Sequence, residues 1–415
     1  MDEIDLPVGD TRPGLSNQQH INKPWILPVI VVSQFFCVSI WFAGNGVMDD
    51  LISSFNLNEA ALAHLTSAVQ LGFIVGTLVF AFLTIADRYS PSKVFFWSAV
   101  IGSGFNLGVI LQSNGLTSLI TFRFLTGFFL AGIYPVGMKI AADYFKKGLG
   151  KSLGFLVGAL VVGTAFPHLL KDFAVDLNWQ MVIVFTSAIA IVGGLLVIIL
   201  VPDGPHRRLG QSLDLTAFLL VFRNKNFRAA AFGYFGHMWE LYAFWAFVPV
   251  ILATYMQYHP GTPINIPLWS FLIIGLGGLA CVIGGYLSLK FGAKKIATYA
   301  LVLSGLCCLV SPLVFYQGDT LAFMLFLIFW GLVVIADSPL FSTLVANNAP
   351  AEFKGTALTI VNCIGFSITI LSIQLINLFT DFINPNLIYI FLAVGPVLGL
   401  WGLLNKGKDT NMTTA

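Results

Sequence analysis

Four ionisable residues lie deep inside apolar stretches of the chain: Arg123, His237, Glu240 and Asp337. His237 and Glu240 are three residues apart, so they share one face of a helix. Asp337 comes two residues before Pro339, and a proline inside a helix leaves a backbone carbonyl of the preceding turn without its donor. Ionisable side chains in apolar surroundings are costly and usually serve a function.

Each of these residue types suggests its own chemistry. Arg123 is a permanent cation that could hold an anionic group of a ligand. Glu240 and Asp337 could take up and release a proton, because burial disfavours the charged form of a carboxyl group. His237 could tune Glu240 or join a proton relay.

Structural roles are open as well. Arg123 could pair with a carboxylate and hold two helices together, and His237 could be a hydrogen-bonded packing residue. His237, Glu240 and Asp337 have the side chains that bind transition metals, but nothing in the sequence fixes their geometry. The sequence therefore predicts no metal site, and no cofactor.

Amide and aromatic side chains recur at a similar depth, where they could contact a ligand or another helix. Asn45 and Asn362 are candidates for ligand contact, and Trp41 is a candidate for the wall of a pocket. Other candidates of the same kinds are Gln34, Gln70, Gln374, Tyr134, Tyr242, Phe244 and Trp245. We expect His64 and His168 to lie near the outer membrane surface.

The composition indicates what surrounds these residues. The chain has 415 residues, of which 57% are hydrophobic and 10% are charged, whereas a soluble domain carries about 25% charged residues. Most of the surface must therefore face lipid. The scattered basic residues exclude a nucleic-acid interface, and the five cysteines lie in apolar runs, where they are expected to be buried and unpaired.

The hydrophobic pattern predicts an all-α polytopic membrane protein with twelve transmembrane helices in two six-helix halves. A spanning helix needs about 20 apolar residues. The candidates are 25–48, 61–84, 94–111, 119–142, 152–171, 179–201, 228–254, 267–289, 296–315, 320–344, 355–379 and 386–403. The predicted parts are an N-terminal tail (1–24), a first half (25–201), a central loop with a short surface helix (202–227), a second half (228–403) and a C-terminal tail (404–415).

Lysine and arginine set the orientation. If the N-terminus is cytoplasmic, 18 of the 21 Lys and Arg residues fall on the cytoplasmic side, including Lys146, Lys147 and Arg208, and only Lys171 falls in an outer loop. This asymmetry is the positive-inside pattern. The polar, acidic first residues are unlike a signal peptide. We expect a multi-pass protein of the plasma membrane, or of the inner membrane in a bacterium, with both termini cytoplasmic.

The two halves show weak internal similarity. The loop Arg88 to Val94 matches Lys290 to Ile296 at an offset of 202 residues. Trp41 matches Trp245 and Pro135 matches Pro339 at an offset of 204. Repeats of this kind are typical of transporters, and here they predict two related halves in parallel register.

Two motifs carry a resemblance to a known family. Ala86-Asp87-Arg88, continuing to Lys93, resembles the loop between the second and third helices of the major facilitator superfamily, although Leu83 and Ser90 replace glycines and Pro91 replaces a basic residue. Arg123, followed by Thr126-Gly127 and Ala131-Gly132, resembles the motif of its fourth helix. The fifth span lacks the Gly-Pro pair of that family's drug–proton antiporters.

The resemblance implies a layout and a function. The first, fourth, seventh and tenth spans would line a central cavity, so Arg123, Glu240 and Asp337 would face it. We expect a secondary transporter that moves a small polar or anionic solute by alternating access, coupled to a proton and acting as a monomer. An efflux carrier for hydrophobic compounds and a transporter-like receptor are the alternatives.

The resemblance also implies a gate on the cytoplasmic side, formed by Asp87, Arg88 and Lys93. The carboxylate of Asp87 would contact the N-terminus of the eleventh helix near Gly355 when the halves close there, because a helix N-terminus attracts negative charge. The alternative is that Asp87 pairs with Arg88 or Lys93 on the surface.

Overall fold

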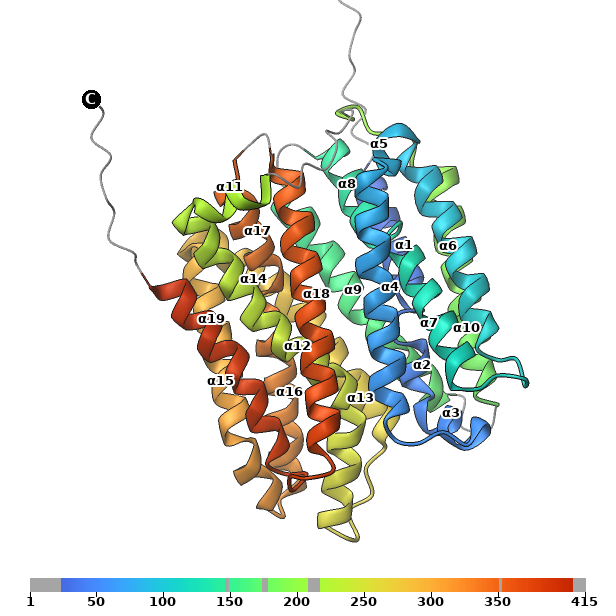
Figure 1. Ribbon diagram of the computed structural model, residues 1–415, viewed down its shortest axis with the longest axis vertical. Helices are drawn as coiled ribbons and strands as arrows, with labels where there is room; N and C mark the ends of the chain where they lie inside the picture. Colours follow the sequence, from blue (N-terminus) through green and yellow to red (C-terminus); the bar gives the residue numbers. More distant parts are fainter. Residues whose placement is uncertain (1–23, 146–148, 174–177, 208–216, 351–352, 406–415) are drawn as a thin grey trace, which may run out of the picture.

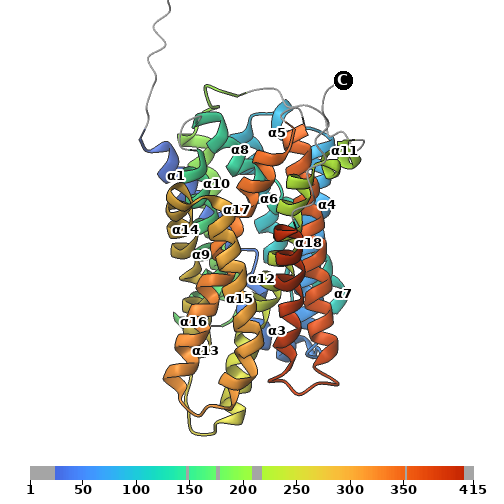
Figure 2. The ribbon, with the colours of Figure 1, turned by 90° about the vertical axis from the view of Figure 1, so that its left-hand side faces the viewer.

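The computed structural model describes residues 24–145, 149–173, 178–207, 217–350 and 353–405. These residues form helices joined by short connections and contain no strand. The helices stand side by side with their long axes roughly aligned (Figure 1, Figure 2). Most of both predicted tails, residues 208–216 of the central loop, Lys146, Lys147 and Arg208 lie outside the described residues.

The first half contains six spans. They are α1 (Ile26–Val38) with α2 (Ala43–Gly46) and α3 (Met48–Phe55); α4 (Ala61–Phe82); α6 (Pro91–Gly108); α7 (Leu116–Leu130) with α8 (Tyr134–Tyr144); α9 (Leu149–Phe173); and α10 (Gln180–Leu200). The short α5 (Ile85–Arg88) lies between α4 and α6.

The second half repeats this number. Its spans are α12 (Lys225–Tyr258); α13 (Ile266–Gly275) with α14 (Gly277–Phe291); α15 (Ala293–Tyr316); α16 (Thr320–Ala336) with α17 (Ser338–Asn348); α18 (Lys354–Phe379); and η2 (Ile388–Ala393) with α19 (Val394–Leu404). The short α11 (Ala217–Arg223) is the described part of the predicted surface helix. Of the described segments, nine are long and apolar enough to cross a membrane by themselves.

The twelve-span prediction is confirmed, but several spans are broken within the membrane. The fourth span breaks at residues 131–133 and the tenth at Asp337, and Pro135 and Pro339 are each the second residue of the helix that follows. These two breaks occupy equivalent positions at the offset of 204 residues found in the sequence. The first span also breaks, at residues 39–42, where the sequence has no proline.

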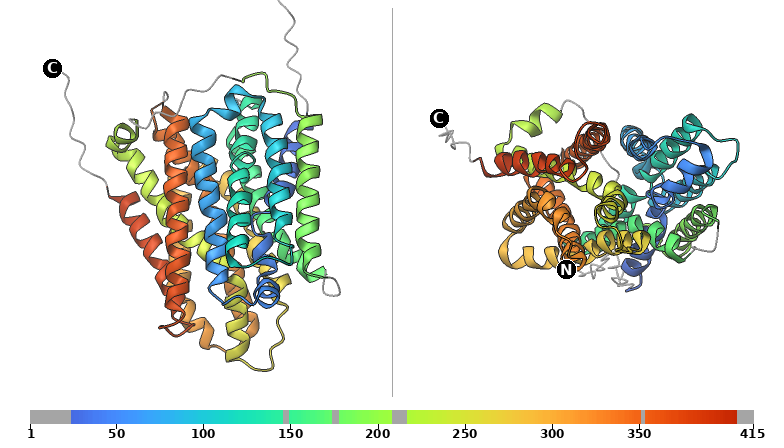
Figure 3. Two further views of the ribbon diagram at one scale, coloured as in Figure 1. Left: turned by 45° about the vertical axis from the view of Figure 1, so that its right-hand side comes forward. Right: turned by 90° about the horizontal axis from the view of Figure 1, so that it is seen from below.

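Small residues let helices approach closely, as is common in membranes. A Cβ atom placed on Gly127 of α7 would lie 2.0 Å from the backbone oxygen of Val69 in α4. The two halves meet in the same way, because a Cβ on Gly278 of α14 would lie 3.0 Å from the backbone oxygen of Gly158 in α9. Viewed from below in Figure 3, the helices form two groups that correspond to the two halves.

The end of the molecule that carries α5 and α11 is uppermost in Figure 1. It is the side that the lysine and arginine count predicts to be cytoplasmic, and we call it the inner side. A cysteine introduced at Ser90 should react only with thiol reagent that reaches the cytoplasm, and one at Asn114 only with reagent outside the cell. Labelling of both positions from one side of sealed membranes would contradict this topology.

Candidate functional site

A cavity of about 730 Å³ lies between the two halves. Its walls come from α4, α8 and α9 of the first half and from α12, α16, α17 and α18 of the second. Lys139, Asn347 and Lys354, near the inner ends of their helices, line it. The cavity therefore belongs to the inner side of the molecule, and its volume suits a small organic molecule.

The outer end of the interface between the halves is closed by hydrogen bonds. Gln374 of α18 donates to the backbone oxygen of Ala63 (3.1 Å) and to the hydroxyl of Ser67 (2.8 Å) in α4. Asn265, which caps α13, donates to Asp172 at the end of α9 over 2.6 Å. The two halves are thus in contact at the outer end, and in the predicted orientation this is an inward-facing conformation.

Aromatic rings form the floor of the cavity. Tyr242 and Phe366 line it, and the buried ring of Trp41 lies behind them, 6.0 Å and 5.7 Å from their ring centroids. Phe73 of α4 is 4.7 Å from Trp41. Trp41 therefore packs beneath the aromatic floor of the cavity and does not line the cavity itself.

Tyrosine and amide groups supply polarity above this floor. Asn362, a predicted contact residue, lines the cavity, and its side-chain oxygen accepts a hydrogen bond of 3.0 Å from the hydroxyl of Tyr234. Tyr134 and Tyr242 line the same space. The sequence argument missed Tyr234, although it lies at helical spacing from Met238, Leu241 and Tyr242, which share the cavity face of α12.

His237 and Asp337 form a buried pair. The Nδ1 atom of His237 lies 2.7 Å from the Oδ1 atom of Asp337, and each side chain is 1% exposed. The side chain that His237 contacts is thus Asp337 and not Glu240, because α12 turns His237 toward the break between α16 and α17. The predicted roles of His237, tuning Glu240 or joining a proton relay, stay predictions. Tyr234 and Ser338, close to the pair in sequence, line the cavity, so the pair lies just behind the cavity wall.

Glu240 lies on a different side of α12. Its carboxylate accepts hydrogen bonds from Trp330 (2.7 Å), Ser304 (2.9 Å) and Cys308 (3.3 Å), which belong to α15 and α16. The side chain is fully buried and does not line the cavity. The implied layout is wrong for this residue, because the cavity face of α12 is taken by its tyrosines.

Arg123 also lies away from the cavity. Its guanidinium donates to the backbone oxygens of Ile40 (3.0 Å) and Trp41, and to Asn106 (3.2 Å). The two carbonyls belong to the break in the first span, where no helical partner is available. Arg123 is 1% exposed. In this geometry the guanidinium of Arg123 is not free to hold an anionic group of a ligand, and its observed partners include no carboxylate.

Asn45 has a similar local role. Its amide donates to the hydroxyl of Thr66 over 2.8 Å, and Thr66 in turn donates to the backbone oxygen of Leu62 over 2.7 Å. The side chain of Asn45 is buried and does not line the cavity. It joins α2 to α4 in the conformation described.

The predicted gate residues contact other parts of the first half. Asp87 forms an ion pair of 2.7 Å with Lys139, not with Arg88 or Lys93. Arg88 donates to the hydroxyl of Thr84 (3.0 Å), and Lys93 is exposed. The partner differs from the predicted alternatives because α8 ends beside α5. Arg207 adds hydrogen bonds to the backbone oxygens of Asp87 and Tyr89.

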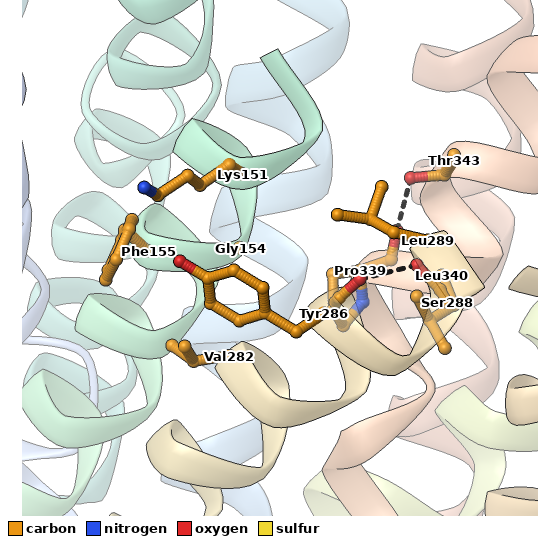
Figure 4. A pocket seen from close by; sticks show the side chains of 11 residues that line it. Lys151, Gly154, Phe155, Val282, Tyr286, Ser288, Leu289, Pro339, Leu340 and Thr343 are labelled. Atoms are coloured by element: carbon orange, nitrogen blue, oxygen red, sulfur yellow. Dashed lines mark hydrogen bonds between the residues drawn. The ribbon is translucent and has the colours of Figure 1, made fainter. Parts of the chain in front are cut away.

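A second, smaller hollow of 120 Å³ lies where α9 meets α14 and α17. Figure 4 shows Tyr286 of α14 reaching toward Lys151 and Phe155 of α9. The Nζ atom of Lys151 is 6.0 Å from the centroid of the Tyr286 ring. Thr343 lines both this hollow and the large cavity, so the small hollow is a side recess at the seam between the halves.

Comparison with known proteins agrees with this architecture. The chain is 25% identical over 186 residues to the 4-hydroxybenzoate transporter PcaK of Acinetobacter baylyi, covering 43% of this chain and 39% of PcaK. It is 24% identical over 174 residues to the probable galactarate/D-glucarate transporter GudP of Escherichia coli, covering 39% and 38%. These matches span less than half the length of each relative.

A solved structure shares the fold over nearly the whole chain. The proton:xylose symporter XylE, bound to 6-bromo-6-deoxy-D-glucose, superimposes with a TM-score of 0.71 at 13% identity, covering 91% of this chain and 94% of XylE. The sequence profile of the Major Facilitator Superfamily matches residues 30–373. Two halves of six helices, a cavity between them and this match lead to one conclusion: the chain belongs to the Major Facilitator Superfamily.

Proposed function

We propose that the protein is a secondary transporter that carries a small organic acid by alternating access, coupled to a proton. The observation that carries the proposal is a cavity of about 730 Å³ between two halves, with a buried His237–Asp337 pair directly behind its wall. A solute bound between the halves can reach either side as the halves rock about it.

The names of the relatives support an acidic solute. They include transporters of 4-hydroxybenzoate, galactarate or D-glucarate, D-galactonate and niacin, all of them carboxylic acids. The cavity matches this chemistry with cations near its inner end and neutral donors within. Lys354 lines it without an ion-pair partner among the described side chains, and Tyr134 and Asn362 lie above its floor.

Uptake into proteoliposomes tests the solute class. Radiolabelled 4-hydroxybenzoate, nicotinate and D-galactonate would be compared with neutral D-xylose under an imposed pH gradient. We expect at least one of the acids to accumulate at least tenfold more than D-xylose. Preference for the neutral sugar over every acid would contradict the proposal for the solute.

The aromatic floor of the cavity favours a second candidate function, an efflux carrier for hydrophobic compounds. Tyr242, Phe366 and Trp41 would stack on a flat, hydrophobic ligand as readily as on an aromatic acid. The same proteoliposomes distinguish the two candidates, because an efflux carrier would move a lipophilic cation such as ethidium against its gradient and leave the acids untouched.

The gate on the inner side remains part of the proposal. The ion pair between Asp87 and Lys139 lies within the first half, so we expect it to persist in both conformations and to favour neither. Contact of Asp87 with the N-terminus of α18 would form only when the inner side closes, and such contacts contribute about 0.3–1 kcal/mol. A contact present in one state alone shifts the equilibrium toward that state.

Asp87→Asn should therefore raise the inward-facing population by about two- to fivefold. Spin labels across the inner mouth, one on each half, would report the distance distribution by electron spin resonance. Lys93→Gln, which removes a nearby exposed charge, is the control. An unchanged distribution in Asp87→Asn would remove Asp87 from the gate.

A further inference from the structure

Among the buried polar side chains that lack hydrogen-bond partners for atoms that ordinarily have them, four lie on the outer side of the cavity. They are Gln70 (both amide atoms), Thr164 (the hydroxyl), His168 (Nε2) and Trp245 (Nε1), and none has a partner for these atoms among the described residues. Each side chain is 3% exposed or less. Buried polar atoms are nearly always paired, so each unpaired one calls for an explanation.

These side chains extend the cavity toward the outer side. On α4, Gln70 lies seven residues before the cavity residue Thr77, which is two helical turns outward on almost the same face. On α12, Trp245 follows the cavity residues Leu241 and Tyr242 by four and three residues. Both helices thus continue their cavity face outward with a polar side chain.

Helix α9 does the same. Thr164 and His168 follow the cavity residue Leu160 at spacings of four and eight. The flanks of this face are fixed by packing: Gly163 lies against Val38 and Phe35 of α1, and Ala165 lies against Gly275 of α13. On the side of α9 opposite Thr164, Val162 lies against Gly278 of α14 and Phe166 lies against Phe35 of α1. Thr164 and His168 therefore face the axis between the halves.

The neighbours of Gln70 place it on the same axis. Thr66 and Phe73 flank it on one side, toward Asn45 and Trp41, while Ser67 flanks it on the other, toward Gln374. Trp245 contacts Tyr242, with 5.2 Å between their ring centroids, directly beneath the cavity floor. Gln34 is also unpaired, but it packs against Gly137 inside the first half and is not part of this set.

We propose that Gln70, Thr164, His168 and Trp245 form a second, outer binding subsite, which is collapsed in the inward-facing conformation and opens when the halves part on the outer side. This subsite proposal rests on the proposed transport function and adds to it the residues that would contact the solute first when it enters from the outer side. The indole N–H, the amide and the hydroxyl together supply several donors. They suit a solute rich in acceptor oxygens, such as a carboxylate with hydroxyl groups.

Thiol labelling tests the location without knowledge of the solute. Thr77→Cys and Gln70→Cys would be treated with a membrane-impermeant methanethiosulfonate reagent from either side of oriented vesicles. We expect Thr77→Cys to react from the inner side and Gln70→Cys from the outer side. Gln374→Ala, which removes the hydrogen bonds that close the outer end, should accelerate the labelling of Gln70→Cys at least fivefold.

The matched control is Leu71→Cys, one residue along α4 and 48% exposed on the lipid-facing side. The five native cysteines are buried, so the unmodified protein serves as the blank. The subsite would be disproved if Gln70→Cys reacted no faster than Leu71→Cys from the outer side in both backgrounds. That result would leave the uptake of organic acids, and hence the proposed function, unaffected.

A second measurement separates binding from structure. Gln70→Leu and Thr164→Val remove polar atoms that have no partner, so the Tm should stay constant or rise. Uptake of 4-hydroxybenzoate, or of whichever panel acid is transported, should fall at least tenfold at equal protein amount. Asn106→Leu, which removes an amide bonded to Arg123 and Ser187, should instead lower the Tm. A lowered Tm with unchanged uptake in Gln70→Leu and Thr164→Val would show that these groups only support the fold.

Discussion

Asp337→Asn is expected to abolish accumulation driven by a pH gradient while leaving solute exchange intact. The carboxyl group of Asp337 lies 2.7 Å from His237 behind the cavity wall, and both side chains are almost wholly buried. An amide keeps the size and the hydrogen-bonding capacity of the carboxyl but cannot take up a proton. Net transport then has no proton to couple to, whereas exchange requires no net change in protonation.

The measurement compares two assays in proteoliposomes. Consider a carrier that moves one proton together with each singly charged anion, so that no net charge crosses the membrane. An inward proton gradient of one pH unit then lets the internal solute concentration reach about ten times the external one, since one pH unit corresponds to about 1.4 kcal/mol. Asp337→Asn should reach only the external concentration, yet exchange internal unlabelled solute for external labelled solute at a rate within about threefold of the unmodified protein.

Glu240→Gln is the matched control, because it removes the other buried carboxylate of this half. Glu240 already accepts three hydrogen bonds from α15 and α16 and lies away from the cavity, so we expect accumulation to survive. If only Glu240→Gln lost accumulation, the coupling role would belong to Glu240. Normal accumulation in both variants would exclude both carboxylates.

Arg123→Leu is expected to reduce the folded stability severely. The guanidinium satisfies the carbonyls of Ile40 and Trp41 and the side-chain oxygen of Asn106. Leaving buried acceptors unpaired costs about 1–3 kcal/mol each, which is a large part of the typical total stability of 5–15 kcal/mol. We expect a fall in Tm of about 10 °C or more in detergent, together with a smaller yield of monodisperse protein.

Arg123→Lys distinguishes this structural role from solute binding. A lysine keeps the charge but offers no planar fork of donors, so it should satisfy one carbonyl and restore only part of the Tm. An anion anchor would behave differently: Arg123→Leu would fold normally and raise the KM for an acidic solute. That combination would contradict the structural assignment.

The sequence predicted the spans well because the bilayer imposes a length and an apolar composition on each of them. It also located the break in the tenth span, since Pro339 follows Asp337 closely. It did not predict the break in the first span, where residues 39–42 contain no proline. That break depends on Arg123, a partner more than 80 residues away in the chain.

The directions of the polar side chains were harder to predict. Helical spacing predicted that His237 and Glu240 would share one face of α12, but His237 contacts Asp337 whereas Glu240 accepts hydrogen bonds from α15 and α16. In the same way, the predicted partner of Asp87 was the N-terminus of the eleventh helix, with its sequence neighbours Arg88 and Lys93 as the alternative, whereas the observed partner is Lys139 of another span. Which neighbour a helix face meets is a property of tertiary packing.

The paired breaks in the fourth and tenth spans carry an evolutionary implication. Ile133 and Asp337 stand at equivalent positions, and the backbone oxygen of each starts the next helix by accepting from Gly137 (2.7 Å) and Phe341 (2.8 Å) respectively. The two bends thus differ in the side chain at the equivalent position, a hydrocarbon in one and an acid in the other. If the halves arose by duplication, one bend would have kept a side chain that cannot ionise while the other acquired an acid. The two halves would then differ in their response to protons through this single pair of residues.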